Sequence, residues 1–95
     1  MATVLYGDLE WDSKKARTNL DKHGVSFEEA AQAFTDPLSI DYDDLAHPDR
    51  LVTLAVSPRG RILYIVTTQR RGRVRVISAR PATPRERREY EEEDR

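Results

Sequence analysis

The sequence predicts an α+β fold: a small antiparallel sheet with a three-stranded meander, packed against two N-terminal helices and followed by a C-terminal helix. Helix-type hydrophobic spacing with capping residues occurs near the N-terminus and again at the C-terminus. In between, apolar residues alternate with a period of two, and short glycine-containing connections separate the alternating runs. The 95 residues are therefore expected to form one domain, residues 1–95.

The N-terminal segment predicts a strand followed by a helix. Residues 4–11 alternate well enough to form a first strand. Asp12 or Ser13 can accept a hydrogen bond from a free backbone N–H group in the first turn of a helix. We expect that helix to run to about His23, because Gly24 readily adopts the left-handed conformation that ends helices.

A second helix is predicted to begin at Ser26, which is followed three residues later by Glu29. In such a capping box the hydroxyl and the carboxylate each accept a hydrogen bond from the other residue's backbone N–H. The helix should end at Asp36-Pro37, because a proline disfavours helical backbone in the residue before it.

The remaining chain predicts strands and a last helix. A strand over residues 38–42 precedes an acidic loop over residues 43–49. Thr83 as N-cap, Pro84 in the first turn and Glu86 as the capping-box acid open the last helix. Short connections containing Gly60 or Gly72 join the three strands of the meander, which are expected over residues 51–57, 61–68 and 73–80.

The charges are distributed unevenly along the chain. Residues 51–88 contain ten arginines, no lysine and one acid, a formal charge of 10 − 1 = +9 within a chain of net charge −1. A polyanion is the natural partner of such a segment, and the guanidinium fork fits two phosphate oxygens at once. For any single arginine, however, a solvated surface position is the commoner explanation.

Arg75 is unusual because it lies in a predicted interior strand between apolar residues. Strict alternation places Arg75, Ile77 and Ala79 on one face of that strand, and Val74 and Val76 on the other. Burying a guanidinium alone is costly. Arg75 therefore requires either a carboxylate partner in the fold or an anionic ligand at an opening, and the sequence leaves both alternatives open.

Several classes of protein are disfavoured. The chain contains no cysteine, which removes disulfides and thiol nucleophiles. It has no apolar run near the roughly 20 residues of a membrane span, and its N-terminus does not have the pattern of a signal peptide. Two histidines and scattered aspartates give weak support for a metal site, so no metal or other cofactor is expected. We expect a cytoplasmic protein.

Two blocks of the sequence resemble the BrnT family, the toxins of a type II toxin–antitoxin system. They are KHGVSF at residues 22–27 and ISAR at residues 77–80, followed by Ala82-Thr83 and Glu86-Arg87, and the resemblance extends over about residues 9–92. It implies a fold related to the RelE-like ribonuclease toxins and a metal-independent endoribonuclease that arrests growth. Where the family usually has Glu-Arg at the end of the central strand, this chain has Gln69-Arg70 and lacks that carboxylate.

The resemblance also implies partners. A co-encoded BrnA-like antitoxin would neutralise the toxin in a hetero-oligomer, for which two copies of each chain is one stoichiometry to consider. Operator DNA, reached through the antitoxin, and the ribosome are further partners to test, beside the RNA substrate.

Metal-free RNA cleavage needs a base, an acid and cations around the reacting phosphate. Arg75, Arg80 and Arg70 are the candidates for phosphate binding, because they lie on or at the ends of adjacent strands in the resembling blocks. His23 and His47 are the candidate acid and base, since only histidine has an ordinary pKa near neutrality. Further RNA contacts are expected from Arg59, Arg61, Arg71, Arg73 and Lys22.

Each histidine also has a simpler interpretation. His23 can be a cation that interacts with a helix C-terminus, and His47 can be a surface residue in its acidic loop. An alternative function stays open as well: a non-catalytic basic module that docks nucleic acid or an acidic protein.

Overall fold

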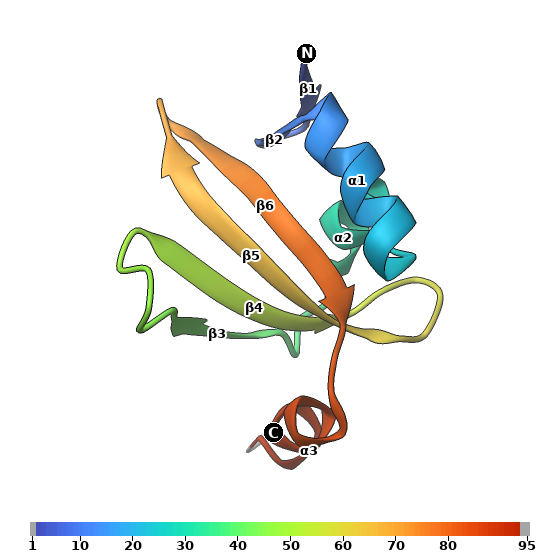
Figure 1. Ribbon diagram of the computed structural model, residues 1–95. Coiled ribbons are helices and arrows are strands. Elements are labelled where there is room, and N and C mark those ends of the chain that lie inside the picture. The colour runs from blue at the N-terminus through green and yellow to red at the C-terminus, as the bar shows by residue number, and fades with distance from the viewer. Residues whose placement is uncertain (1, 94–95) are drawn as a thin grey trace.

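The computed structural model describes residues 2–93, so residues 1, 94 and 95 of the predicted domain lie outside it. Within this range, six strands form one sheet in the order β1-β2-β6-β5-β4-β3, accompanied by three helices (Figure 1). The elements are β1 Thr3–Tyr6, β2 Leu9–Asp12, α1 Ser13–His23, α2 Phe27–Ala33, β3 Ile40–Asp43, β4 Arg50–Val56, β5 Ile62–Arg70, β6 Arg73–Pro81 and α3 Pro84–Glu92.

The α+β class and the meander are confirmed, but the small antiparallel sheet is wrong. The meander β4–β5–β6 forms the centre of a larger, mixed sheet, because β2 pairs with β6 in parallel through Leu9–Val74 and Glu10–Arg75. The single strand predicted over residues 4–11 is a hairpin of β1 and β2, whose turn contains Gly7 at a φ of 57°. The relation to RelE-like toxins stays a prediction.

The predicted ends of α1 and the predicted start of α3 are confirmed, but α2 ends at Ala33, before the predicted Asp36-Pro37. Asp12 caps α1 by accepting from Lys15 N, and Gly24 ends it at a φ of 70°. Thr83 and Glu86 form the complete capping box of α3. At α2 only half of the predicted box exists: Ser26 accepts from Glu29 N at 3.0 Å, while the Glu29 carboxylate binds elsewhere, as described below.

The hydrophobic core lies between the sheet and the two N-terminal helices (Figure 1). Trp11 is 1% exposed and meets the ring of Phe27 edge-on at a centroid distance of 5.8 Å. The sheet supplies the other side of the core with Ala55, Leu63, Ile65, Val76 and Ala79. Helix α3 lies beyond the end of the sheet, where the buried Tyr90 donates its hydroxyl to Asp36 Oδ2 at 2.5 Å (Figure 1).

A β-bulge in β6 overturns the predicted alternation. Val66 pairs with Ser78 and Thr67 with Val76, so Ile77 has no partner on β5. Ala79 therefore joins Val76 in the core, instead of sharing the face of Arg75. Arg75 and Arg80 instead share one face, because they pair with Thr68 and Tyr64, which are four residues apart on the unbroken β5.

Asn19 of α1 replaces a neighbouring strand at the edge of β6. Strand β2 accompanies β6 only as far as Arg75 and then gives way to α1. The buried side chain of Asn19 accepts from Ala79 N at 3.1 Å and donates to Ala79 O at 2.7 Å. Its Nδ2 also donates to Val25 O at 2.9 Å, which connects the end of α1 to the same point of the sheet.

None of the helices in residues 2–93 is both long and apolar enough to cross a membrane.

We expect Asn19→Ala to lower the free energy of unfolding by about 2–3 kcal/mol, because it leaves buried backbone groups of Ala79 and Val25 without partners. Urea unfolding measures the effect. Thr18→Ala is the control, since Thr18 is exposed and bonds only within its own helix; it should change stability by less than about 0.5 kcal/mol. Equal stability of the two variants would contradict this role of Asn19.

Candidate active site

The face of the sheet opposite α1 and α2 carries the candidate site. Side chains on β5 that alternate with the core residues Leu63 and Ile65 belong to this face. Cross-strand pairing adds residues of β4 and β6 to the same surface. We call this surface the arginine face; its residues are Arg50, Tyr64, Thr68, Arg70, Arg73, Arg75, Ser78 and Arg80.

Arg75 has a carboxylate partner. Its Nη1 lies 2.5 Å from Glu10 Oε2, and the two side chains are only 13% and 10% exposed. Parallel pairing of β2 with β6 places these two residues side by side. Of the two alternatives left by the sequence, the structure therefore supplies the partner within the fold.

Arg73 extends the same arrangement to the β1–β2 turn. Its Nη2 donates to Gly7 O and, at 2.7 Å, to Leu9 O. Its buried Nε has no hydrogen-bond acceptor in the described residues and lies 3.7 Å from Glu10 Oε1. Glu10 thus lies between two guanidinium groups, and Arg73 and Arg75 hold β6 to the N-terminal hairpin.

Arg80 forms the second charged cluster of the face. Its Nη1 and Nη2 donate to the two carboxylate oxygens of Glu86 at 2.8 and 2.9 Å, a bidentate pair. The guanidinium carbon lies 3.9 Å from the centre of the Tyr64 ring. The Arg80 side chain remains 31% exposed, so it is accessible from solvent.

The surroundings of this cluster set its protonation. Burial raises the pKa of Glu86, but the hydrogen bonds from Arg80 and from Thr83 outweigh burial, so the pKa lies below its ordinary value. Burial raises the pKa of Tyr64, and burial together with Tyr64 and Glu86 raises the pKa of Tyr42 to about 12. At neutral pH the cluster therefore contains the Glu86 carboxylate, the Arg80 guanidinium and the protonated phenols of Tyr64 and Tyr42. Of these four residues, only Arg80 was predicted from the sequence as a site residue.

The predicted residues Lys22 and His23 lie on a different part of the molecule. They line a hollow of about 410 Å³ between α1 and β6, together with Ile77 and Ser78 at the bulge. We call it the basic hollow; its other residues are the N-cap Asp12 and, from α1, Lys14, Lys15, Thr18, Asn19, Lys22 and His23. It adjoins the arginine face because Ser78 belongs to both.

The structure does not bring the two histidines together. His47 lies exposed in the β3–β4 loop, where its backbone bonds to Asp44 and Arg50. His23 is half-buried at the end of α1, beside the basic hollow.

The turn arginines separate into two groups at opposite ends of β5. At the β4–β5 turn, Arg61 donates to both oxygens of Glu29 at 2.8 and 2.7 Å and to Gly24 O at 2.7 Å. Arg59 lies 3.7 Å from the same carboxylate. Arg70 and Arg71, at the β5–β6 turn, are exposed and form no ion pair within residues 2–93.

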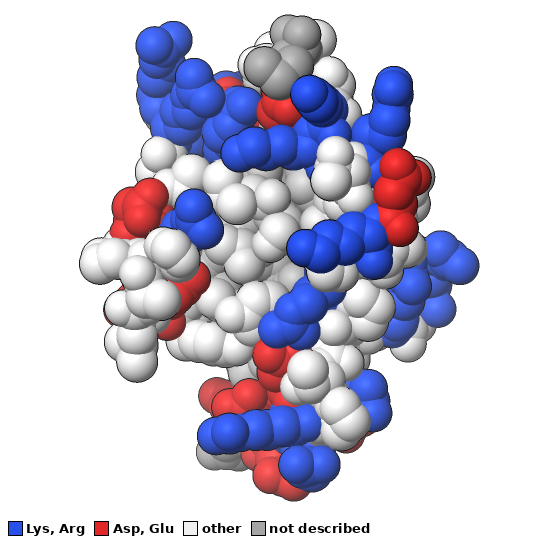
Figure 2. Space-filling model, in the orientation of Figure 1, with Lys and Arg blue, Asp and Glu red and all other residues white. Residues whose placement is uncertain are grey.

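Figure 2 shows the same division on the surface. Basic side chains gather at the upper left, over the tip of the β5–β6 hairpin, and others lie around an uncharged central area. Acidic side chains gather over α3 at the bottom of the view. The segment of charge +9 therefore does not form one continuous patch.

The Glu29–Arg61 pair is structural. Hydrogen bonding from Arg61 lowers the pKa of Glu29, against a smaller opposing effect of burial. A carboxyl whose pKa is lower in the folded state stabilises the fold above its ordinary value of 4.5, and this stabilisation is lost as the pH falls below that value.

We therefore expect Glu29→Gln to lower the free energy of unfolding at pH 7 by about 1–3 kcal/mol. The difference from the wild type should shrink as the pH falls below 4.5, the ordinary pKa of this carboxyl. Urea unfolding across this pH range measures both effects. Glu28→Gln, at the exposed neighbouring residue, is the control; the same loss in both variants would refute the assignment.

The fold of this chain is similar to that of a solved protein structure. The 1.1 Å crystal structure of the Brucella abortus ribonuclease toxin BrnT is similar, with a TM-score of 0.63 and 24% sequence identity. The match covers 77% of this chain and 92% of that one, so the two proteins share a fold over most of their length. No curated protein sequence matches significantly.

The family follows from the sequence. The model of the ribonuclease toxin BrnT of type II toxin–antitoxin systems matches residues 11–86. The chain belongs to this family, and the resemblance inferred from the KHGVSF and ISAR blocks is confirmed. An RNA substrate and an antitoxin partner follow from membership of this class.

Proposed function

We propose that this chain is a metal-independent endoribonuclease that arrests growth and is neutralised by a co-encoded BrnA-like antitoxin. The observation that carries the proposal is the cluster of Arg80, Glu86 and Tyr64: a cation, a carboxylate and a protonated phenol on an exposed edge of the arginine face. Metal-free cleavage uses the RNA 2′-hydroxyl as nucleophile and needs these three kinds of group.

In this mechanism Arg80 binds the scissile phosphate. A phosphate offers the same bidentate geometry as the Glu86 carboxylate, so it competes for the same N–H groups. Once Arg80 turns towards the phosphate, Glu86 loses hydrogen bonds that keep its pKa low. Its basicity then increases, and it can accept the proton of the 2′-hydroxyl. Substrate binding thereby activates the base.

Tyr64 is the proposed proton donor to the departing 5′-oxygen. Its raised pKa keeps the hydroxyl protonated, and its ring already contacts the guanidinium that binds the phosphate. His23 remains the alternative acid, since it lines the basic hollow together with Ser78, which belongs to the arginine face.

The rest of the RNA would follow β6. Arg70 and Arg71 are exposed at one end of the hairpin, and the lysines of the basic hollow lie on α1 beside Ile77 and Ser78 of the strand. Arg75, held by Glu10, acts as a positioning residue in this proposal. Arg61 lies at the other end of β5, and its hydrogen bonds to Glu29 keep it from serving as an RNA contact in this proposal.

The alternative is a non-catalytic basic module. It is favoured by one observation: Arg59, Arg61, Arg73, Arg75 and Arg80 already face carboxylates within the fold. Such a module would bind RNA in a salt-dependent manner without cleaving it.

Incubation of the pure protein with RNA and EDTA distinguishes the two functions. We expect cleavage to continue in EDTA and to leave 2′,3′-cyclic phosphate ends, because the nucleophile comes from the RNA itself. Mass spectrometry of the fragments identifies these ends. RNA that stays intact, with and without ribosomes, would contradict the enzymatic function.

We expect Arg80→Ala to reduce the cleavage rate by about 100-fold or more, as loss of a transition-state donor does elsewhere. Tyr64→Phe keeps the ring beneath Arg80 and removes only the hydroxyl, so its loss of rate isolates the proton donor. Glu86→Gln tests the base. Arg17→Ala, on the exposed side of α1, is the control and should cleave normally. Full activity of Arg80→Ala, with thermal melting confirming its fold, would refute the site.

A further inference from the structure

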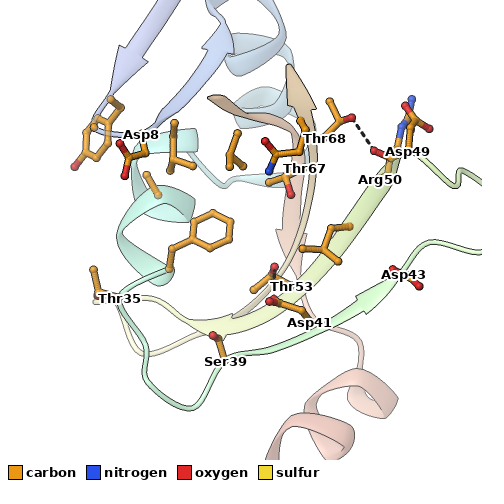
Figure 3. Close-up of a pocket in the computed structure, with 18 of the residues that line it drawn as sticks. Asp8, Thr35, Ser39, Asp41, Asp43, Asp49, Arg50, Thr53, Thr67 and Thr68 are labelled. Carbon is orange, nitrogen blue, oxygen red and sulfur yellow. Dashed lines mark hydrogen bonds between the residues drawn. The ribbon is translucent and has the colours of Figure 1, made fainter. Parts of the chain in front are cut away.

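The side of the sheet that carries α1 and α2 contains a groove that neither helix fills. Its volume is about 830 Å³, and it extends from the β1–β2 turn past the end of α2 to β3 and the β3–β4 loop (Figure 3). It lies mainly on the helix side of the sheet, because Thr53 and Thr67 line it and alternate with residues of the arginine face; at one end its lining reaches Arg50 and Thr68 of that face.

The floor of the groove is apolar. Leu51 and Val74 contribute to it from the sheet, Leu9 from β2, and Ala31 and Phe34 from α2 and its C-cap. Leu51 remains 37% exposed, and Tyr6 at the rim is 39% exposed. Side chains of this kind lose water when an apolar segment covers them, which gives the groove affinity for a protein partner.

The rim is acidic on two sides. Asp8 lies at the β1–β2 turn, across the groove from Asp41 and Asp43 on β3 (Figure 3). Asp49 adds a fourth carboxylate and Arg50 is the single basic residue in the lining, so the formal charge is 1 − 4 = −3. Within residues 2–93, none of these four aspartates has an ion-pair partner.

This combination points to a cationic, partly apolar segment. A phosphodiester chain would be repelled by the four carboxylates, so the groove does not suit RNA. Lysine or arginine side chains on both sides of an apolar stripe would meet carboxylates on both rims. The protein partner that membership of this toxin family implies is the antitoxin.

We propose that this groove is the docking site for a segment of the cognate antitoxin whose apolar side chains are flanked by lysines or arginines. The proposal rests on the proposed function, since it assumes a neutralising antitoxin. It places antitoxin binding and RNA binding on opposite faces of one sheet, so a substitution in the groove can free the toxin without touching the residues that cleave RNA.

The test uses the antitoxin encoded beside this chain and two groove variants. Asp43→Lys reverses one rim charge at an exposed side chain, and Leu51→Glu places a charge on the floor. Asp21→Lys, an equal charge reversal on the exposed side of α1, is the matched control. Titration calorimetry gives Kd, and in-vitro RNA cleavage and growth arrest give the activity.

We expect Kd for the antitoxin to rise at least tenfold in Asp43→Lys and in Leu51→Glu, and to stay unchanged in Asp21→Lys. Both groove variants should cleave RNA as the wild type does and should arrest growth even when the antitoxin is co-expressed. If the antitoxin binds both groove variants as tightly as the wild type, while the wild-type protein cleaves RNA, the docking proposal is overturned and the proposed function stands. If the wild type does not cleave RNA, the proposed function fails, and the binding measurements still decide the docking site.

Discussion

The side-chain bonds of Asn19 to the backbone of Ala79 are the interaction on which the rest of the structure depends. A strand that loses its neighbour partway along leaves backbone N–H and C=O groups without partners. In β6 this happens after Arg75, and Asn19 supplies one acceptor and one donor where a strand would have done so. Because the bonded residue follows the bulge at Ile77, the same contact fixes the register in which β6 continues.

That register decides which arginine side chains lie on the same face of the sheet. With strict alternation, Arg80 would point to the face opposite Arg75, into the core beneath the helices. The bulge inserts one residue between them, so both side chains reach the open face, and Ala79 fills the core position. The small side chain of Ala79 suits this position, since α1 packs directly against it through Asn19. The role proposed for Arg80 thus depends on a backbone irregularity that a helix side chain holds in place.

The parts of the fold that could be predicted from the sequence are those decided by neighbouring residues. The cap at Asp12, the end at Gly24 and the capping box at Thr83 are local, and all three were correct. The half-formed box at Ser26 shows the limit of local prediction, because the Glu29 carboxylate accepts from Arg61, which is 32 residues away in the chain, instead of completing the box. The parallel pairing of β2 with β6 and the bulge at Ile77 are non-local in the same way.

The candidate site was predicted only in part, for a related reason. An excess of arginine is visible in any composition count, but the partner of each guanidinium is not. Three carboxylates distant from one another in the sequence, Glu10, Glu29 and Glu86, hold five of the arginines between them. The −6 charge of residues 1–50 and the +9 charge of residues 51–88 are thus partly paired across the fold.

Charged side chains outside these ion pairs lie on different faces of the sheet, because successive side chains of a strand point to opposite faces. Side chains that alternate along β3, β4 and β5 place aspartates and two threonines on the groove side, and tyrosines and Arg70 on the opposite side. A one-residue shift of register would exchange the two surfaces. The bond between Asn19 and Ala79 resists such a shift in β6, so the same contact that keeps Arg80 on the open face also keeps the proposed RNA site and the acidic groove apart. Separate faces would let one small sheet bind the two proposed partners, which carry opposite charges.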